Sequence, residues 1–328
     1  MSAAVDVDVL IVGAGPVGLY GAYYAGFRGL SVALIDSLPE AGGQVTAMYP
    51  EKQIFDVAGF PAIKGRELVA GLVAQAAAFQ PRYLLGRQAM TLAYEPAGAM
   101  QVTADDGTTI GCRAVIISGG IGTFTPRPLP AGSEYENRGL CYFVPSLLEH
   151  ADRDVVIVGG GDSAFDWALN LEPIARSVTL VHRRPAFRAH AHTVSQVRAG
   201  RTEIITPAQV TAVRGQERVE EVDIDIDGTA RTLPAQTLIA ALGFVANLGP
   251  LKEWGMTVVS HRHIPVDTTM LTDLPGVFAA GDIAEYPGKV RLIATGFGEV
   301  ATAVNNAAVL IDPSAHLFPG HSSEAVPA

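Results

Sequence analysis

The sequence predicts an α/β protein with two Rossmann-like, three-layer ββα nucleotide-binding domains, the second of which is inserted into the first. The main observation is a glycine loop that occurs twice, as Gly-Ala-Gly-Pro-Val-Gly at residues 13–18 and as Gly-Gly-Gly-Asp-Ser-Ala at residues 159–164. Each loop follows a short apolar run typical of a buried parallel strand and precedes a helical segment. A later strand-like run, residues 277–282, ends in Gly-Asp. The 328 residues and a hydrophobic content of 48% suffice for two well-buried cores.

The order of the expected elements sets the predicted domain boundaries. Residues 1–120 and 243–328, with a C-terminal tail at 313–328, should form one domain, and residues 121–242 should form the inserted one. The glycine-containing segments 119–122 and 242–244 are the predicted crossings between them. The other expected helices and strands are helices 19–27, 65–79, 165–171 and 299–310, the last opened by residues 295–298, and strands 100–103, 109–117, 204–205, 221–225 and 238–241.

The glycine loops predict binding of a dinucleotide pyrophosphate. In such a loop the first glycine permits a tight turn, the second lets the backbone approach the pyrophosphate, and the third lets helix and strand pack closely. The pyrophosphate then lies at the helix N-terminus, where free N–H groups and the helix dipole favour negative charge. The residues expected to bind are Gly13, Gly15 and Gly18 in the first loop, and Gly159, Gly161, Asp162 and Ser163 in the second. A glycine-rich turn without a ligand is the alternative interpretation.

The two copies differ at the position that follows the second strand. The first copy has Asp36 there, whereas the second has His182, Arg183 and Arg184. A carboxylate at this position accepts hydrogen bonds from ribose hydroxyls but repels a 2′-phosphate, which favours FAD or NAD. Two guanidinium groups offer forked donors that suit a phosphate monoester, so the second site should prefer NADP(H). The alternative is that these arginines are solvated loop charges.

Composition argues against several other functions. The formal net charge is −10, from 23 basic and 33 acidic residues, and no basic stripe stands out, so nucleic-acid binding is not expected. The apolar stretches are too short or interrupted to span a bilayer, and the first residues lack the basic region of a signal peptide, which predicts a soluble, cytoplasmic protein. Cys112 and Cys141 are isolated, so neither a disulfide framework nor a metal site is expected, and Cys112 lies in a core-like apolar run.

Several segments together resemble a known family. The Gly-Asp strand end and the short inserted domain, with its arginine pair and Phe187-Arg188-Ala189, resemble the thioredoxin reductase branch of the two-dinucleotide-binding-domain flavoproteins. The dithiol enzymes of that branch carry a Cys-x-x-Cys pair just before the second glycine loop, where this chain has only Cys141. Without the cysteine pair, nearly the whole chain resembles the thioredoxin-reductase-like ferredoxin–NADP⁺ reductases. The segments that carry this resemblance are 49–52, 56–61, 167–169 and the tail after Pro313. It departs from their pattern at Pro185 and in its last residues.

The resemblance implies a non-covalent FAD in the first domain and NADP(H) in the second. It implies six further FAD contacts, namely Gln44, Tyr49, Ala89, Phe124, Asp282 and Ser323. Asp282 could accept hydrogen bonds from flavin ribityl hydroxyls, and Thr295 lies where helix N–H groups could face the flavin pyrimidine, although either residue could instead be a helix N-cap. On the nucleotide side, His182 and Arg188 complete the expected NADP contacts.

Two rings are implied to cover the flavin. Tyr49 would stack on one face and His321 on the other, unless Tyr49 is a core tyrosine and His321 is merely solvated. If the tail with His321 comes from the other protomer, the functional unit is a homodimer.

The activity that the resemblance implies is hydride transfer from NADPH to flavin N5, followed by two single-electron transfers to a ferredoxin or flavodoxin. The flavin carries this chemistry, so no side-chain nucleophile is needed. Since ferredoxins are generally acidic, docking needs a local basic patch, for which Lys52, Lys64 and Arg66, or Arg198 and Arg201, are candidates. An NADPH-dependent flavin or quinone (diaphorase-type) reductase and a non-catalytic NADPH-sensing flavoprotein remain the alternatives.

Overall fold

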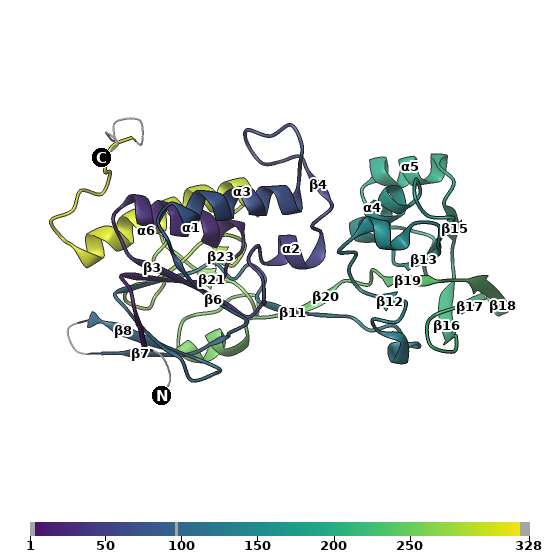
Figure 1. The fold of residues 1–328 in the computed structure, drawn as a ribbon, viewed down its shortest axis with the longest axis horizontal. Coiled ribbons are helices and arrows are strands. Elements are labelled where there is room, and N and C mark those ends of the chain that lie inside the picture. Colours follow the sequence, from purple (N-terminus) through teal and green to yellow (C-terminus); the bar gives the residue numbers. More distant parts are fainter. Residues whose placement is uncertain (1–3, 96–97, 322–328) are drawn as a thin grey trace. The chain divides into compact units, whose positions relative to one another are not determined.

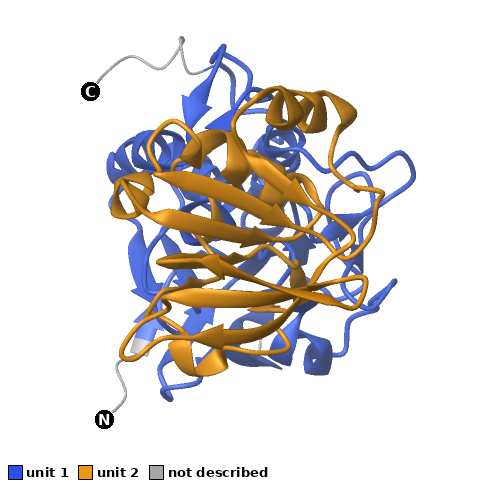
Figure 2. Ribbon diagram, turned by 90° about the vertical axis from the view of Figure 1, so that its right-hand side faces the viewer, with its two compact units in different colours: residues 1–47, 52–124, 246–328 blue, residues 48–51, 125–245 orange. Residues whose placement is uncertain are grey.

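The structure, a computed structural model, describes residues 4–95 and 98–321 of the chain (Figure 1). The chain divides into two compact units, which Figure 2 colours separately. Unit 1 comprises residues 1–47, 52–124 and 246–328, and unit 2 comprises residues 48–51 and 125–245. Both contain a five-stranded parallel sheet, which confirms the predicted α/β class with two Rossmann-like domains.

The parallel sheet of unit 1 is covered by helices on one face. Its strands, in spatial order, are β22 (Val277–Ala279), β10 (Ala114–Ile117), β2 (Val9–Val12), β3 (Val32–Asp36) and β6 (Arg82–Leu85). All four residues of β2 are buried, as expected of a central parallel strand that is covered on both faces. The helices are α1 (Pro16–Phe27), α3 (Gly65–Ala77) and α6 (Ile293–Ile311), and α1 contacts both of the others. An apolar surface all round α1 fits this position.

A second sheet supplies the third layer of unit 1. It contains β1 (Ala4–Asp6), β9 (Thr109–Cys112), β8 (Met100–Ala104) and β7 (Ala89–Tyr94). Buried residues of β8 and β9, such as Val102 and Ile110, share one core cluster with Leu10 and Ile35 of the parallel sheet, which gives the predicted ββα layering. The run 109–117, predicted as one strand, divides at Arg113, because the chain passes there from one sheet to the other. Short elements complete the unit: α2 (Gln44–Met48), β4 (Gln53–Ile54), β5 (Ile63–Lys64), β21 (Ile264–Pro265), β23 (Ala284–Glu285) and a 3₁₀ helix at Gly249–Trp254.

Unit 2 repeats the parallel plan with a smaller second layer. Its parallel strands are β12 (Leu140–Cys141), β19 (Thr237–Ala240), β13 (Asp154–Val158), β14 (Ser177–Val181) and β15 (Glu203–Ile205), with helices α4 (Asp162–Leu171) and α5 (Ala191–Ala199). The antiparallel strands are β16 (Gln209–Arg214), β17 (Glu221–Ile226) and β18 (Thr229–Pro234), of which the sequence predicted only β17. Strand β18 was not predicted because its first four residues are all exposed. Its sequence therefore lacks the alternation of apolar and polar residues that indicates a strand.

Two strands connect the units. The strands β11 (Thr123–Pro126) and β20 (Phe244–Asn247) pair with each other as a two-stranded ladder. The glycines that precede them, Gly120, Gly122 and Gly243, all have positive φ values of 59°, 81° and 83°. Residues with a Cβ atom rarely adopt this backbone conformation. The turns that lead into the two crossings therefore require glycine.

The observed helix starts correct three predictions. The helix α4 begins at Asp162 rather than at 165. The helix α6 begins at Ile293 rather than at 299, so the run 295–298 lies inside its first two turns instead of ahead of them. The helix α1 begins at Pro16 rather than at 19, which fits the preference of proline for the first helical position, where no N–H partner is needed. None of the helices in the described part of the chain is both long and apolar enough to cross a membrane.

Candidate functional site

The first glycine loop joins the end of β2 to the N-terminus of α1. Gly13 has φ +111° and donates its N–H to the Ile35 carbonyl at 2.8 Å. A Cβ atom at Gly18 would lie 1.9 Å from the Gly13 carbonyl oxygen, so only glycine permits this approach of helix and loop. At Gly15 a Cβ would meet no described atom within 4 Å, which leaves open space at the helix N-terminus. The three glycines thus have the geometry of a pyrophosphate cradle.

Asp36 is tied directly to this loop. Its Oδ2 accepts a hydrogen bond from the Ala14 N–H at 2.7 Å, and its Oδ1 accepts one from the Leu38 N–H at 2.9 Å. Burial raises the pKa of the Asp36 carboxyl, while the two hydrogen bonds oppose the rise. The carboxylate therefore lies beside the loop with lone pairs still available to ribose hydroxyls.

The other predicted flavin contacts, which belong to unit 1 except for Tyr49 of unit 2, have different surroundings. Gln44 begins α2, and its side-chain amide lies so close to Gly120 that a Cβ there would be 2.5 Å from Nε2. Ala89 is buried in β7 within the core cluster, so it can offer a cofactor little beyond its backbone. Tyr49 is half-buried and directly follows α2. The predicted contacts of the Phe124 side chain and of Ser323 lie outside the described part of the structure.

The Gly-Asp turn after β22 meets the N-termini of two helices. Gly281 has φ +80°, and the nearest atom to a Cβ placed there would be Val17 Cγ2 of α1, at 3.3 Å. A Cβ at Gly296 of α6 would lie 2.4 Å from the same Val17 methyl group and 3.3 Å from Gly281 Cα. The two glycines therefore form a notch for Val17, and this notch brings together the turn, the glycine-loop helix and the start of α6.

Asp282 carries a half-buried carboxylate at this turn. Within the part of the chain that the structure describes, no hydrogen bond to its side chain occurs, and burial raises the pKa of the carboxyl. The N-cap interpretation is wrong for Asp282, since α6 starts only at Ile293, and for Thr295, since the N-cap of α6 is Leu292. A half-buried carboxylate normally accepts hydrogen bonds, and none of the described residues donates one to Asp282. Hydroxyl groups of a bound ligand could supply these hydrogen bonds.

Sequence reasoning missed the residues that support this turn. Glu299 of α6 is buried and accepts hydrogen bonds from the Gly281 N–H at 2.8 Å and the Tyr286 hydroxyl at 2.6 Å, and it forms an ion pair with Lys289. The only signal in the sequence was a charged residue within an otherwise apolar helix start.

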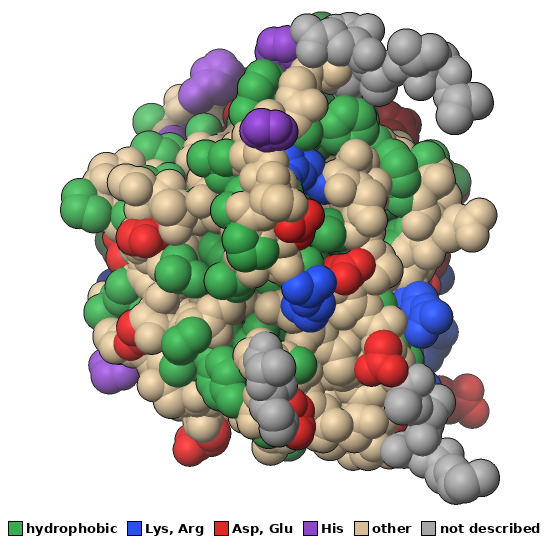
Figure 3. Space-filling model, turned by 90° about the vertical axis from the view of Figure 1, so that its left-hand side faces the viewer, with side chains coloured by type: hydrophobic (Ala, Val, Ile, Leu, Met, Phe, Trp, Pro, Cys, Tyr) green, Lys and Arg blue, Asp and Glu red, His purple; other side chains and the backbone are tan. Residues whose placement is uncertain are grey.

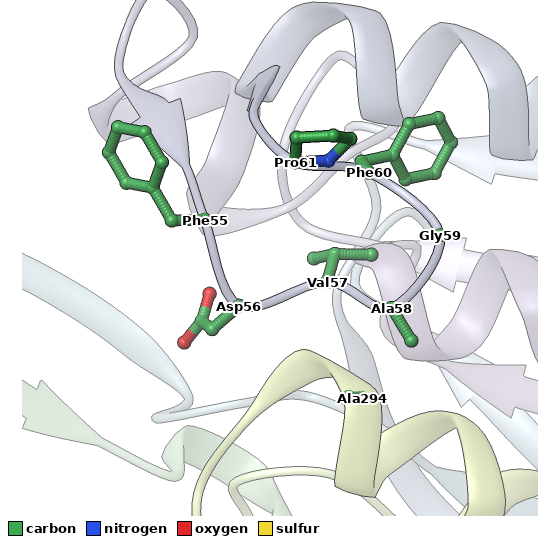
Figure 4. A pocket seen from close by; sticks show the side chains of 8 residues that line it. All are labelled: Phe55, Asp56, Val57, Ala58, Gly59, Phe60, Pro61 and Ala294. Atoms are coloured by element: carbon green, nitrogen blue, oxygen red, sulfur yellow. The ribbon is translucent and has the colours of Figure 1, made fainter.

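An open pocket lies between the loop 55–61 and the first turn of α6 (Figure 4). Its volume is about 590 Å³, and it is lined by Phe55, Asp56, Val57, Ala58, Gly59, Phe60, Pro61 and Ala294. Phe55 and Phe60 are 72% and 45% exposed. The loop connects the paired strands β4 and β5, which keep its ends together. The sequence shows residues 56–61 only as part of the family resemblance, and no pattern in it predicts this pocket.

The described part of the tail is attached to the far end of α1. The Arg28 guanidinium, at the C-terminal end of that helix, donates a hydrogen bond to the His316 carbonyl at 2.8 Å. His321 is exposed, and its ring meets Phe318 edge-on with centroids 5.2 Å apart.

The first glycine of the second loop, in unit 2, packs closely on neighbouring backbone, as Gly13 packs on the Ser118 carbonyl. A Cβ at Gly159 would lie 2.4 Å from the Ala241 carbonyl oxygen, whereas one at Gly161 would meet no described atom within 4 Å. The third position is the buried Ala164. Asp162 and Ser163 are exposed in the first turn of α4. Open space again lies where a pyrophosphate would bind.

The arginine segment folds back on this second loop. The Arg188 N–H donates to the Gly160 carbonyl at 2.7 Å, and Asp162 accepts a hydrogen bond from the His190 N–H at 2.8 Å. The His182 ring packs on Gly160, where a Cβ would lie 2.4 Å from it; burial, and then the neighbouring arginine charges, lower the pKa of this histidine. Arg183, Arg184 and Arg188 are all exposed, and their charges act on His182, the ring that packs on this loop.

Neither the surface charge in Figure 3 nor any group of metal-binding side chains in the described residues indicates a further binding site. The face shown in Figure 3 carries scattered basic and acidic side chains without a continuous basic stripe. Within residues 4–95 and 98–321, no cluster of three or more histidine, cysteine or acidic side chains could hold a metal ion. Burial raises the pKa of both Cys112 and Cys141 to about 12.

Comparison with known proteins assigns the family. Residues 7–307 match the model of the pyridine nucleotide-disulphide oxidoreductases. Two curated relatives, each named ferredoxin–NADP reductase, are 64% identical over 324 residues (Nocardioides sp.; 98% of both chains) and 66% identical over 317 residues (Frankia alni; 96% of this chain and 98% of the relative). The solved thioredoxin reductase of T. acidophilum is 27% identical and superposes with a TM-score of 0.77 over 92% of this chain and 98% of its own. The resemblance predicted from the sequence is therefore confirmed, and the chain belongs to the pyridine nucleotide-disulphide oxidoreductase family.

Proposed function

We propose that this chain is an FAD-dependent ferredoxin–NADP⁺ oxidoreductase. The observation that carries the proposal is the pair of glycine loops with opposite neighbours, the Asp36 carboxylate at one and exposed arginines at the other. The names of relatives that are 64% and 66% identical over nearly the whole chain support the same activity. A bound FAD would supply hydride acceptance from NADPH at N5 and single-electron transfer to an iron–sulfur or flavin protein.

Residues of unit 1 would hold FAD without a covalent bond. The first glycine loop would receive the pyrophosphate, Asp36 the adenosine ribose, and Asp282 the ribityl hydroxyls. The N-terminus of α6, where Thr295 lies in the first turn, would direct its N–H groups and dipole at the pyrimidine side. The backbone of Ala89, together with Gln44, Phe124 and Ser323, completes the proposed set.

Residues of unit 2 would bind NADP(H). The N-terminus of α4, with Asp162 and Ser163 in its first turn, would face the pyrophosphate. Arg183, Arg184 and Arg188 would read the 2′-phosphate, while the ring of His182 packs against the loop. Positive φ at Gly120, Gly122 and Gly243 supports the crossings as hinges that let the nucleotide domain move.

The position of the tail supports a homodimer. The glycine loop lies at the N-terminus of α1 and the tail is held at its C-terminus, about 18 Å away for a helix of 12 residues. We propose that His321 therefore covers the flavin of the partner protomer, opposite Tyr49.

Ferredoxin docking is proposed at the hairpin of β4 and β5. Lys52 and Lys64 lie at its base, where the Gly65 N–H donates to the Lys52 carbonyl at 3.1 Å, and Arg66 follows in α3. The exposed Phe55 lies in its loop. A basic surface beside an apolar tip suits an acidic electron-transfer protein such as ferredoxin or flavodoxin.

The deciding experiment measures which acceptor the reconstituted protein reduces with NADPH. Reduction of cytochrome c should require added ferredoxin and should slow as salt is raised, because docking is electrostatic. Fast reduction of free flavin or quinone without a ferredoxin-dependent rate would favour the diaphorase-type alternative, to which the open pocket at 55–61 is suited. NADPH binding without turnover on any acceptor would indicate a sensor.

The glycine loop predicts opposite effects of two alanine substitutions. Gly15→Ala should leave the melting temperature of the apoprotein unchanged, since φ −71° and ψ −179° suit alanine and the space is open, yet it should weaken FAD binding about tenfold or more. Gly18→Ala should instead cost about 1–3 kcal/mol of stability through overpacking. Calorimetry and flavin-fluorescence titration separate the two, and equal FAD affinity of Gly15→Ala and wild type would contradict the cradle.

The arginine pair predicts nucleotide choice. Replacing Arg183 and Arg184 together by alanine should weaken NADPH about 100-fold, because two charge-assisted interactions are lost, but NADH only slightly. The exposed Arg218 of the same unit provides the control, Arg218→Ala, for which neither KM should change. Equal losses for NADPH and NADH would show that the pair does not read the 2′-phosphate.

The raised thiol pKa values predict that no cysteine relays electrons. With a pKa of about 12, both thiols stay protonated at neutral pH, so iodoacetamide should label the native protein slowly even at Cys141, which is only half-buried, whereas Cys112 is buried. Cys141→Ala should retain turnover with ferredoxin. Rapid native labelling of Cys141, or loss of turnover in this variant, would refute the prediction.

A further inference from the structure

Glu299 has an unusually complete set of partners for a buried carboxylate. Its side chain is 4% exposed, and that of its ion-pair partner Lys289 is 1% exposed. One oxygen accepts the Gly281 N–H, and the other accepts the Tyr286 hydroxyl and pairs with the Lys289 ammonium. All three donors come from residues 281–289, so one acidic side chain of α6 fastens the whole segment that carries Asp282.

The same lysine lies within electrostatic reach of Asp282. Among the charges that lower the pKa of Asp282, Lys289 is the largest, ahead of Arg291, with His263 as a smaller contribution and Glu299 acting in the opposite direction. Lys289 nevertheless pairs with Glu299. The Asp282 carboxylate receives no hydrogen bond from any residue that the structure describes, and its backbone carbonyl accepts one from His263 at 3.1 Å.

We propose that Glu299 is a positioning residue that holds the Lys289 ammonium away from Asp282, so that the Asp282 carboxylate remains available to hydroxyl groups of the flavin cofactor. This inference rests on the proposed flavin site in unit 1. A buried ammonium that loses its partner turns to the nearest anion, because an unpaired buried charge is costly. Without the Glu299 charge, Lys289 would pair with Asp282 and occupy the lone pairs that the cofactor needs.

The test compares FAD binding to the apoproteins of four chains by quenching of flavin fluorescence. Glu299→Gln keeps the size of the side chain and an acceptor for Gly281 but removes its charge, so FAD affinity should fall about tenfold, the worth of a hydrogen bond to a charged group. Adding Lys289→Met removes the competing ammonium, so the double variant should recover to within about threefold of wild type. Glu203→Gln, which breaks an exposed ion pair with Arg231 in unit 2, is the control and should bind as wild type does.

A second readout is the titration of the Asp282 carboxyl in the same apoproteins, followed by carbon NMR. Its pKa should fall in Glu299→Gln, where the Glu299 charge that raises it is lost and Lys289 pairs with it, and should rise again in the double variant, where that cation is gone. Recovery of FAD affinity in the double variant is the result that a purely structural role of Glu299 would not produce. If Glu299→Gln does not fold, the double variant, which leaves no unpaired buried charge, carries the test.

Three results would overturn the inference: wild-type affinity in Glu299→Gln, a double variant as weak as the single one, or an unchanged Asp282 pKa. Failure of the wild-type apoprotein to bind FAD at all would instead refute the proposed function.

Discussion

The close approach of α1 to the loop at its own N-terminus is the contact on which the first site depends. Only a hydrogen atom fits between Gly18 and the Gly13 carbonyl, and this fixes where the free N–H groups of the helix point. Because Asp36 ends the adjacent strand and accepts the Ala14 N–H, the carboxylate that we propose binds ribose is held beside the same loop. The second unit has Ala164 at the position of Gly18, so it lacks this contact and shares only the approach of its first glycine to neighbouring backbone, Gly159 to the Ala241 carbonyl, as Gly13 approaches the Ser118 carbonyl. The carboxyl edge of each parallel sheet is thus prepared for a nucleotide.

The buried ion pair of Lys289 and Glu299 lies at the turn that follows β22. Breaking a buried ion pair by removing one partner costs about 3–5 kcal/mol, so the pairing of Lys289 with Glu299 constrains the turn strongly. Val17 fills the notch between Gly281 and Gly296, so apolar packing and the ion pair act on the same few residues. A mobile turn would lose the fixed position of Asp282 that a flexible hydroxylated ligand requires, since rigid sites bind with less entropic cost.

The sequence predicted those features that depend on local spacing. The glycine loops, the acid that ends β3 and the arginines after β14 follow from residues close to one another in the chain. Features that depend on tertiary contact were missed. Glu299 gave no sign that its partners would be Gly281, Tyr286 and Lys289, and the run 109–117 gave none that Arg113 would divide it between two sheets. The predicted start of α6 lies six residues beyond the observed one, because Thr295 and Gly296 are typical of a loop. In the structure Gly296 lies within the helix, where the absence of a side chain allows the helix to approach Gly281.

The most direct test of the account is a calorimetric titration of the apoprotein with the fragment 2′,5′-ADP, before and after saturation with FAD. Each glycine loop should bind a single adenine nucleotide, and the two loops differ by one carboxylate at the first and a group of exposed arginines at the second. We expect one molecule of FAD per chain, and one molecule of 2′,5′-ADP that competes with NADP⁺ and binds equally well whether or not FAD is present. Displacement of FAD by 2′,5′-ADP, or equal binding of 5′-AMP and 2′,5′-ADP at the second loop, would contradict it.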